Sequence, residues 1–142
     1  DIAKRLGASA CVDYHGGEKV ALAVKDALGG AGADIVIEAV GNAGHLPQML
    51  GSLAEGGRLF LFGIPGDLQY PANLFHGPSR YSIVKKTADE WQSHGQVLTH
   101  YLTGEIKPED FCDGVLPLEK INAGFDAIRR KEAVKLTVMM PH

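Results

Sequence analysis

The residues best placed to bind a ligand are two glycines that each follow a run of apolar residues. The run IVIEAV leads into Gly41, and the run RLFLF leads into Gly63. An amphipathic stretch joins the two runs, so the segment from Ala33 to Pro65 is predicted to form a parallel strand–helix–strand unit. Both glycines then lie at the carboxyl ends of strands, which is where ligands bind in open α/β sheets.

The other reactive side chains show no pattern of a metal or nucleophile site. Cys11 and Cys112 lie far apart in the sequence, and the six histidines have no ligand spacing. We therefore predict no catalytic and no metal-ligating residue in this chain. Glu38 is the odd polar group within the first apolar run, and we expect it to have a hydrogen-bonding role rather than a catalytic one.

Length, composition and charge exclude several classes of protein. The 142 residues suit about one domain, and 45% hydrophobic with 22% charged residues is typical of a globular chain. A net charge of -3 argues against nucleic-acid or anionic-membrane partners, which need basic patches. No apolar run approaches the roughly 20 residues that span a bilayer. Two unpaired cysteines favour a reduced, cytoplasmic protein.

Hydrophobic periodicity predicts the elements that position the glycine loops. An uninterrupted apolar run is typical of a parallel strand that is covered on both faces. We expect strands at Ala10–Tyr14, Asp34–Val40, Arg58–Phe62 and Arg80–Val84, and helices at Glu18–Leu28 and Gly44–Leu53.

The second half of the chain departs from simple strand–helix alternation. Thr87 and Glu90 form a possible capping box for a helix that carries Trp91. A further helix carries Phe125, and both aromatic residues are predicted to be core. The tail AVKLTVMM alternates as a half-exposed strand does. The pattern as a whole is α/β, with domains predicted at residues 1–85 and 86–142.

The first residues read as the last turns of a helix that Gly7 ends. A helix rarely starts at a bare charged terminus without a cap. We therefore expect that the sequence is truncated at its N-terminus.

Five segments together resemble the C-terminal half of a zinc-dependent medium-chain alcohol dehydrogenase, a member of the medium-chain dehydrogenase/reductase superfamily. They are LGASACVDY, GADIVIEAVGN, GGRLFLFGIP, YLTGEI and VLPLEKINAGFDAIRRKEAVKLTV. The resemblance covers nearly the whole chain in the family's order, and it is weakest over Gly66–Lys86.

The resemblance implies a partial Rossmann-type parallel sheet. The four predicted strands match strands 3 to 6 of that sheet, and strands 1 and 2 are missing, together with the glycine-rich phosphate turn. The final helix and strand would return to the catalytic domain. Zinc is expected in the full-length enzyme, but its ligands are absent here, so this fragment alone should be inactive. Ala10–Tyr14 would have no sheet neighbour, and Asp34–Val40 would present an apolar edge.

The resemblance also assigns cofactor-binding residues at the strand ends. Ala39, Val40 and Gly41 follow strand 4, where matching residues pack near the adenosine half of the cofactor. Phe62 and Gly63 match the strand end whose backbone meets the nicotinamide carboxamide, and a Cβ at residue 63 would block that approach. The alternative for these positions is ordinary strand termination and a plain turn glycine.

Two further positions carry over from the family. Ile83, near the end of strand 6, should approach the nicotinamide ring, although Lys85 stands where small apolar residues are usual. Lys135 matches a basic position that contacts the cofactor pyrophosphate. The alternative for Lys135 is a solvent-exposed place on the last strand.

The implied activity is hydride transfer between NAD or NADP and a small-molecule alcohol or carbonyl substrate. The residue that distinguishes the two cofactors follows strand 2 and is absent here. Leu68–Ala72 matches an edge strand that joins subunits, so a homodimer or homotetramer is expected. Two alternatives stay open: a zinc-free quinone or enoyl reductase of the same superfamily, and a non-catalytic nucleotide-binding module, which would unfold cooperatively as an isolated chain.

Overall fold

The computed structural model describes residues 2–13, 19–63, 76–85 and 90–141. The chain divides into two compact units, one of residues 10–88 and one of residues 1–9 together with 89–142. The assignment of residues 1–85 and 86–142 to two domains of a whole protein stays a prediction.

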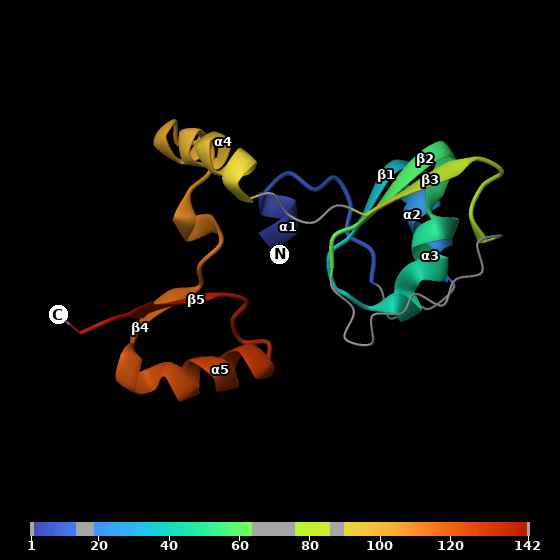
Figure 1. Ribbon diagram of the computed structural model, residues 1–142. Helices are drawn as coiled ribbons and strands as arrows, with labels where there is room; N and C mark the ends of the chain where they lie inside the picture. The colour runs from blue at the N-terminus through green and yellow to red at the C-terminus, as the bar shows by residue number, and fades with distance from the viewer. Residues whose placement is uncertain (1, 14–18, 64–75, 86–89, 142) are drawn as a thin grey trace. The chain divides into compact units, whose positions relative to one another are not determined.

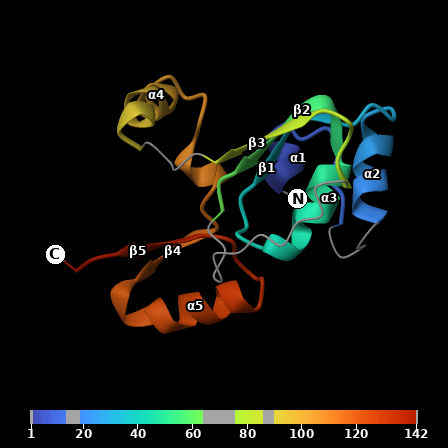
Figure 2. The same ribbon diagram turned by 45° about the vertical axis from the view of Figure 1, so that its right-hand side comes forward.

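The unit of residues 10–88 is built on a three-stranded parallel sheet. The strands β1 (Ala33–Glu38), β2 (Leu53–Leu61) and β3 (Tyr81–Lys85) lie in that order (Figure 1). The helices α2 (Lys19–Ala27) and α3 (Leu46–Gly51) lie together on one side of this sheet, and a short 3-10 helix, η2 (Ala43–His45), precedes α3 (Figure 2). The α/β class with a parallel sheet is confirmed.

A small leucine core holds this unit together. Leu46 and Leu50 of α3 pack against Leu53 and Leu59 of β2, and all four are buried. Leu50 and Leu59 are completely removed from solvent, and each such side chain contributes roughly 1.5–3 kcal/mol of burial free energy.

The opposite face of β1 is open among the described residues. Val36 pairs in register with Leu59 and packs on the leucine core, whereas Ile37 is 62% exposed. Successive side chains of a strand point to opposite faces. The prediction that this strand is covered on both faces is therefore wrong for the described part of the chain, because both helices pack on the same face.

Several elements of this unit differ from the predictions. Residues 10–13 of the expected strand Ala10–Tyr14 form no strand, because no described strand lies beside them to complete a ladder. The expected helix Gly44–Leu53 ends at Gly51, and Leu53 instead begins β2. β2 therefore starts five residues before the predicted Arg58, and Leu53 already pairs with Ala33.

The other unit contains a second, smaller parallel sheet. The strands β4 (Gly114–Pro117) and β5 (Leu136–Met139) pair in parallel, and α5 (Ile121–Arg129) connects them. The half-exposed character of the tail strand is confirmed, since exposure alternates along β5. β4 was not predicted as a strand. This unit also holds α1 (Ile2–Arg5), α4 (Glu90–Leu102) and the 3-10 helices η4 (Pro108–Asp110) and η5 (Leu118–Lys120).

The predicted burial of two aromatic side chains is wrong. Trp91 on α4 is 92% exposed, and Phe125 on α5 is also exposed. Neither helix finds a partner for this part of its apolar face within the described residues. Thr87 of the expected capping box lies outside those residues. The helix end at Gly7 is confirmed, with a φ of 103° that favours glycine.

No described helix combines the length and the apolar character needed to cross a membrane.

Candidate functional site

The carboxyl ends of β1, β2 and β3 lie at one edge of the three-stranded sheet. Glu38 of β1 pairs with Leu61 of β2, and Leu61 pairs with Lys85 of β3, so the strands end in register. The residues that follow β1 and β2 are therefore neighbours. Five of the seven predicted cofactor-binding residues belong to this edge: Ala39, Val40, Gly41, Phe62 and Gly63. Ile83 lies in the middle of β3, where it pairs with Leu59.

Apolar side chains stand exposed at this edge. Val40 is 74% exposed and Phe62 is 56% exposed. An exposed valine and phenylalanine offer apolar contact, which makes up most of the lining of a small-molecule site.

The glycine at position 63 is required by a contact between the two loops. A Cβ built on Gly63 would lie 2.8 Å from the Cα of Gly41 and closer still to the Gly41 nitrogen and to Oε2 of Glu38. Gly41 itself has a φ of 76°, in the left-handed region. The sequence interpretation, in which a Cβ would block a cofactor, is not needed to explain Gly63, because the neighbouring loop already fills that space.

Glu38 connects both loops. Its side chain is fully buried, and its Oε1 accepts hydrogen bonds from the backbone N–H groups of Val40 at 2.8 Å and Gly41 at 2.7 Å. Its backbone carbonyl accepts hydrogen bonds from Phe62 and Gly63, both at 2.8 Å. The expected hydrogen-bonding role is confirmed. The sequence analysis did not predict that Glu38 also bonds to the loop after β2. The only indication in the sequence was a charged residue inside an apolar run.

Lys135 belongs to the other unit, where it precedes β5. Its backbone is fixed by Asp113: Oδ2 of Asp113 accepts hydrogen bonds from Val134 at 2.6 Å and from Lys135 at 3.1 Å, and the Lys135 carbonyl accepts one from the Asp113 N–H. The Val134 and Lys135 N–H groups lower the pKa of Asp113 from its ordinary value. The Lys135 side chain is exposed, so an anion can reach it.

Cys112 lies beside the same pair of strands. Its Sγ is 3.1 Å from Oγ1 of Thr137, and this hydroxyl is the main cause that lowers the pKa of the Cys112 thiol. Nothing else about this cysteine indicates a nucleophile.

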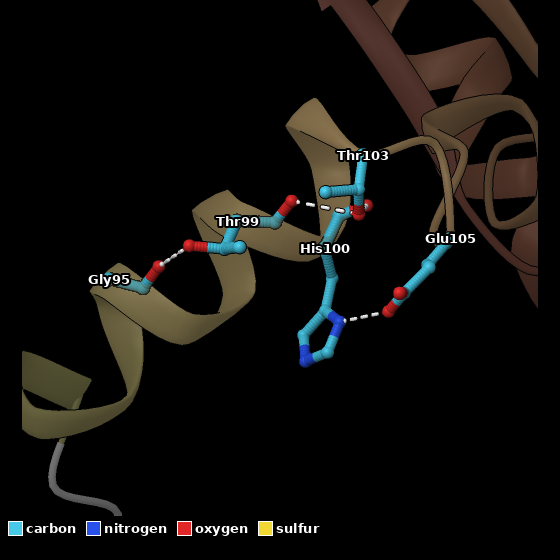
Figure 3. A network of polar contacts seen from close by, with 5 residues as sticks. All are labelled: Gly95, Thr99, His100, Thr103 and Glu105. Atoms are coloured by element: carbon cyan, nitrogen blue, oxygen red, sulfur yellow. Dashed lines mark hydrogen bonds and ion pairs between the residues drawn. The ribbon is translucent and has the colours of Figure 1, made fainter.

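A cluster of polar side chains forms hydrogen bonds along α4 and just after its end (Figure 3). Thr99 and Thr103 donate to carbonyl groups one turn earlier, at 2.9 Å to Gly95 and 3.0 Å to Thr99. Nδ1 of His100 contacts Oε2 of Glu105, a residue that follows the helix, and both side chains are exposed. These contacts tie the end of α4 to the chain after it.

An open apolar groove of about 600 Å³ runs along β1. Ile35 and Val36 of β1, Val20 and Val24 of α2, and Met49 of α3 line it. Among the described residues, β1 has a neighbouring strand on one side only, so the predicted apolar edge of this strand is confirmed. Pairing with a further strand would cover it.

No metal site is built from the described residues. They contain no group of three or more His, Cys, Asp or Glu side chains that could hold a metal ion. Zinc sites in proteins use three or four such ligands, so the described residues do not fit a zinc ion.

Comparison with known proteins gives a consistent match. A family model described as "Zinc-binding dehydrogenase" matches residues 1–90. An L-threonine 3-dehydrogenase of Caldanaerobacter subterraneus subsp. tengcongensis is 25% identical over 97% of this chain and 40% of its own length. An erythritol/L-threitol dehydrogenase of Mycolicibacterium smegmatis is 24% identical over 97% of this chain and 38% of its own length.

The fold comparison agrees. The solved structure of an alcohol dehydrogenase from Thermus sp. ATN1 superposes with a TM-score of 0.74 at 28% identity, covering 85% of this chain and 35% of that one. This chain thus spans about two fifths of the length of the curated relatives it matches.

Proposed function

Since this chain belongs to the zinc-binding dehydrogenase family, we propose that the protein of which it is part transfers a hydride between NAD or NADP and an alcohol or carbonyl substrate. The observation that carries the proposal is the sheet edge at which the loops after β1 and β2 meet, with Val40 and Phe62 exposed beside them. Nucleotides bind at this edge in open parallel sheets.

Each residue of the site has a proposed task. Ala39 and Val40 would pack against the adenosine half of the dinucleotide, with Gly41 leaving the loop backbone accessible. The backbone at Phe62 and Gly63 would meet the nicotinamide carboxamide, since Phe62 stands exposed at the end of β2. Ile83 would contact the nicotinamide ring.

Lys135 belongs to the other compact unit, and its contact with the cofactor pyrophosphate stays a prediction. Its backbone N–H donates to Oδ2 of Asp113, and its carbonyl accepts a hydrogen bond from the Asp113 N–H. The dinucleotide supplies or accepts the hydride when bound, and these residues bind and orient it.

Zinc assistance is proposed for the whole protein on the family's description alone. The described residues hold no suitable group of ligands. We expect the 142 residues alone to be inactive toward alcohols and carbonyl compounds, because no residue among those described is placed to activate the substrate oxygen. A cytoplasmic location and a homodimer or homotetramer formed through Leu68–Ala72 stay predictions; that segment lies outside the described residues.

Binding of NADH and NADPH, measured by isothermal titration calorimetry, tests the proposal. We expect Val40→Asp to weaken binding by about tenfold or more, because it places a carboxylate and its hydration shell where the adenosine would pack, and tenfold corresponds to about 1.4 kcal/mol. Folding should not change, since Val40 is 74% exposed. Leu22→Asp, at an apolar position on α2 that is 64% exposed, is the matched control and should bind as the wild type does.

Two results would contradict the proposal. The first is a wild-type protein that binds neither dinucleotide. The second is a Val40→Asp protein that binds the dinucleotides as tightly as the wild type does. This result would show that the adenosine does not bind at this edge.

A further inference from the structure

Glu38 occupies a position where a carboxylate is costly. It is the last residue of β1 and fully buried, whereas the apolar Ile35 and Ile37 of the same strand are exposed. Burial of an ionised carboxylate without partners is strongly unfavourable. The hydrogen bonds from the Val40 and Gly41 N–H groups to Oε1 offset that cost, and bonds to a charged acceptor are stronger than neutral ones.

The same residue fixes the second loop through its backbone. The Glu38 carbonyl accepts hydrogen bonds from both Phe62 and Gly63. Gly63 also lies so close to Gly41 and to Oε2 of Glu38 that a Cβ has no room there. The carboxylate, its carbonyl and the two loops are therefore one packed unit, in which the loop after β1 cannot move without the loop after β2.

We propose that Glu38 is a positioning residue that sets the spacing of the Val40–Gly41 and Phe62–Gly63 loops and so determines how tightly the dinucleotide binds. This inference rests on the proposed function. Glu38 does not touch the cofactor, because its side chain is fully buried. It acts through the two loops, which must be held to within about 0.5 Å for a binding site to keep its affinity.

Two variants of Glu38 and one control test the proposal in the full protein. Glu38→Gln keeps an oxygen that can accept from Val40 and Gly41 but removes the charge, and Glu38→Ala removes the acceptor. Glu55→Gln is the matched control, since Glu55 also accepts a backbone N–H, from Ser79 at 3.1 Å, but lies near the start of β2 and is exposed.

Two measurements are made on each variant. The first is the Kd for NADH, which we expect to rise by about tenfold in Glu38→Ala, with a smaller rise in Glu38→Gln and none in Glu55→Gln. The second is amide hydrogen exchange. Exchange of Val40 and Gly41 should accelerate in Glu38→Ala, and exchange of Phe62 and Gly63 should accelerate with it.

A purely structural role would give a different pattern. Thermal stability would then fall, while the folded fraction would bind NADH with the wild-type Kd; that result would overturn the proposal. Acceleration confined to Val40 and Gly41, with Phe62 and Gly63 unchanged, would overturn it as well. A wild-type protein that binds no dinucleotide would instead overturn the proposed function, and the exchange data would still decide whether Glu38 couples the loops.

Discussion

Substitution of Gly63 by alanine is the sharpest test of the contact between the two loops. The added Cβ would lie 2.8 Å from the Cα of Gly41 and nearer to the Gly41 nitrogen. Carbon atoms reach their optimal separation at about 3.5–4.0 Å, so one loop must move by about 0.7 Å or more. The atoms in the way are mainly backbone, which cannot relax by changing a rotamer.

The magnitude follows from the cost of overpacking. Inserting a methyl group into a packed site costs about 1–3 kcal/mol, and we expect the upper half of that range because Glu38 holds both loops in place. For a unit of the size of residues 10–88, each kcal/mol shifts the Tm by about 4–8 °C. Gly63→Ala should therefore lower the Tm by on the order of 10 °C, as measured by circular dichroism at 222 nm.

A second glycine provides the control for this experiment. A Cβ on Gly95, within α4, would meet nothing within 4 Å, so Gly95→Ala should leave stability unchanged or raise it by up to about 1 kcal/mol. A Gly63→Ala protein that unfolds at the wild-type temperature would refute the reasoning, because the two loops would then have room that the structure does not give them.

Three other predictions concern the core and the second sheet. Leu50→Ala should cost about 2–5 kcal/mol in urea unfolding, since Leu50 is fully buried, while Leu22→Ala should change little; equal effects would contradict the packing described. The lowered pKa of Asp113 means that its carboxylate stabilises the fold above its ordinary pKa of 3.8 and that this contribution is lost as pH falls through the lower folded value. The difference in the free energy of unfolding between wild type and Asp113→Asn, measured from pH 7 to pH 2.5, should therefore shrink toward zero at the acid end. A constant difference would show that the Asp113 charge does not stabilise the fold. Thr137→Val should raise the pKa of Cys112, seen as slower alkylation by iodoacetamide at pH 7.5 in a Cys11→Ser background, and an unchanged rate would show that the hydroxyl does not stabilise the thiolate.

The sequence was sufficient to predict the parallel sheet and the edge at which the loops meet. The apolar runs that end at Gly41 and Gly63 became β1 and β2, and their loops are neighbours because parallel strands end at one edge. The local sequence pattern is enough to predict this unit, because both strands and the helix between them are contiguous in the sequence.

Several failures of prediction share one cause, which is that burial and strand pairing depend on what lies beside an element. Residues 10–13 have strand composition but form no strand, because no described neighbour offers them hydrogen bonds. Ile37 and Trp91 sit in apolar patterns but are exposed, because no described element packs on those faces. Hydrophobic periodicity identifies the face that needs a partner and cannot show whether a partner is present.

The case for a nucleotide site at this edge depends on exposure rather than on the glycines. Gly63 is fully explained by its contact with Gly41, so its presence says nothing about a ligand. Val40 and Phe62 are exposed on loops that are joined through the side chain and the backbone carbonyl of Glu38, and Val40 also lines the groove along the open side of β1. The rigid support beneath an uncovered apolar surface is what a site for a flat, partly apolar cofactor requires.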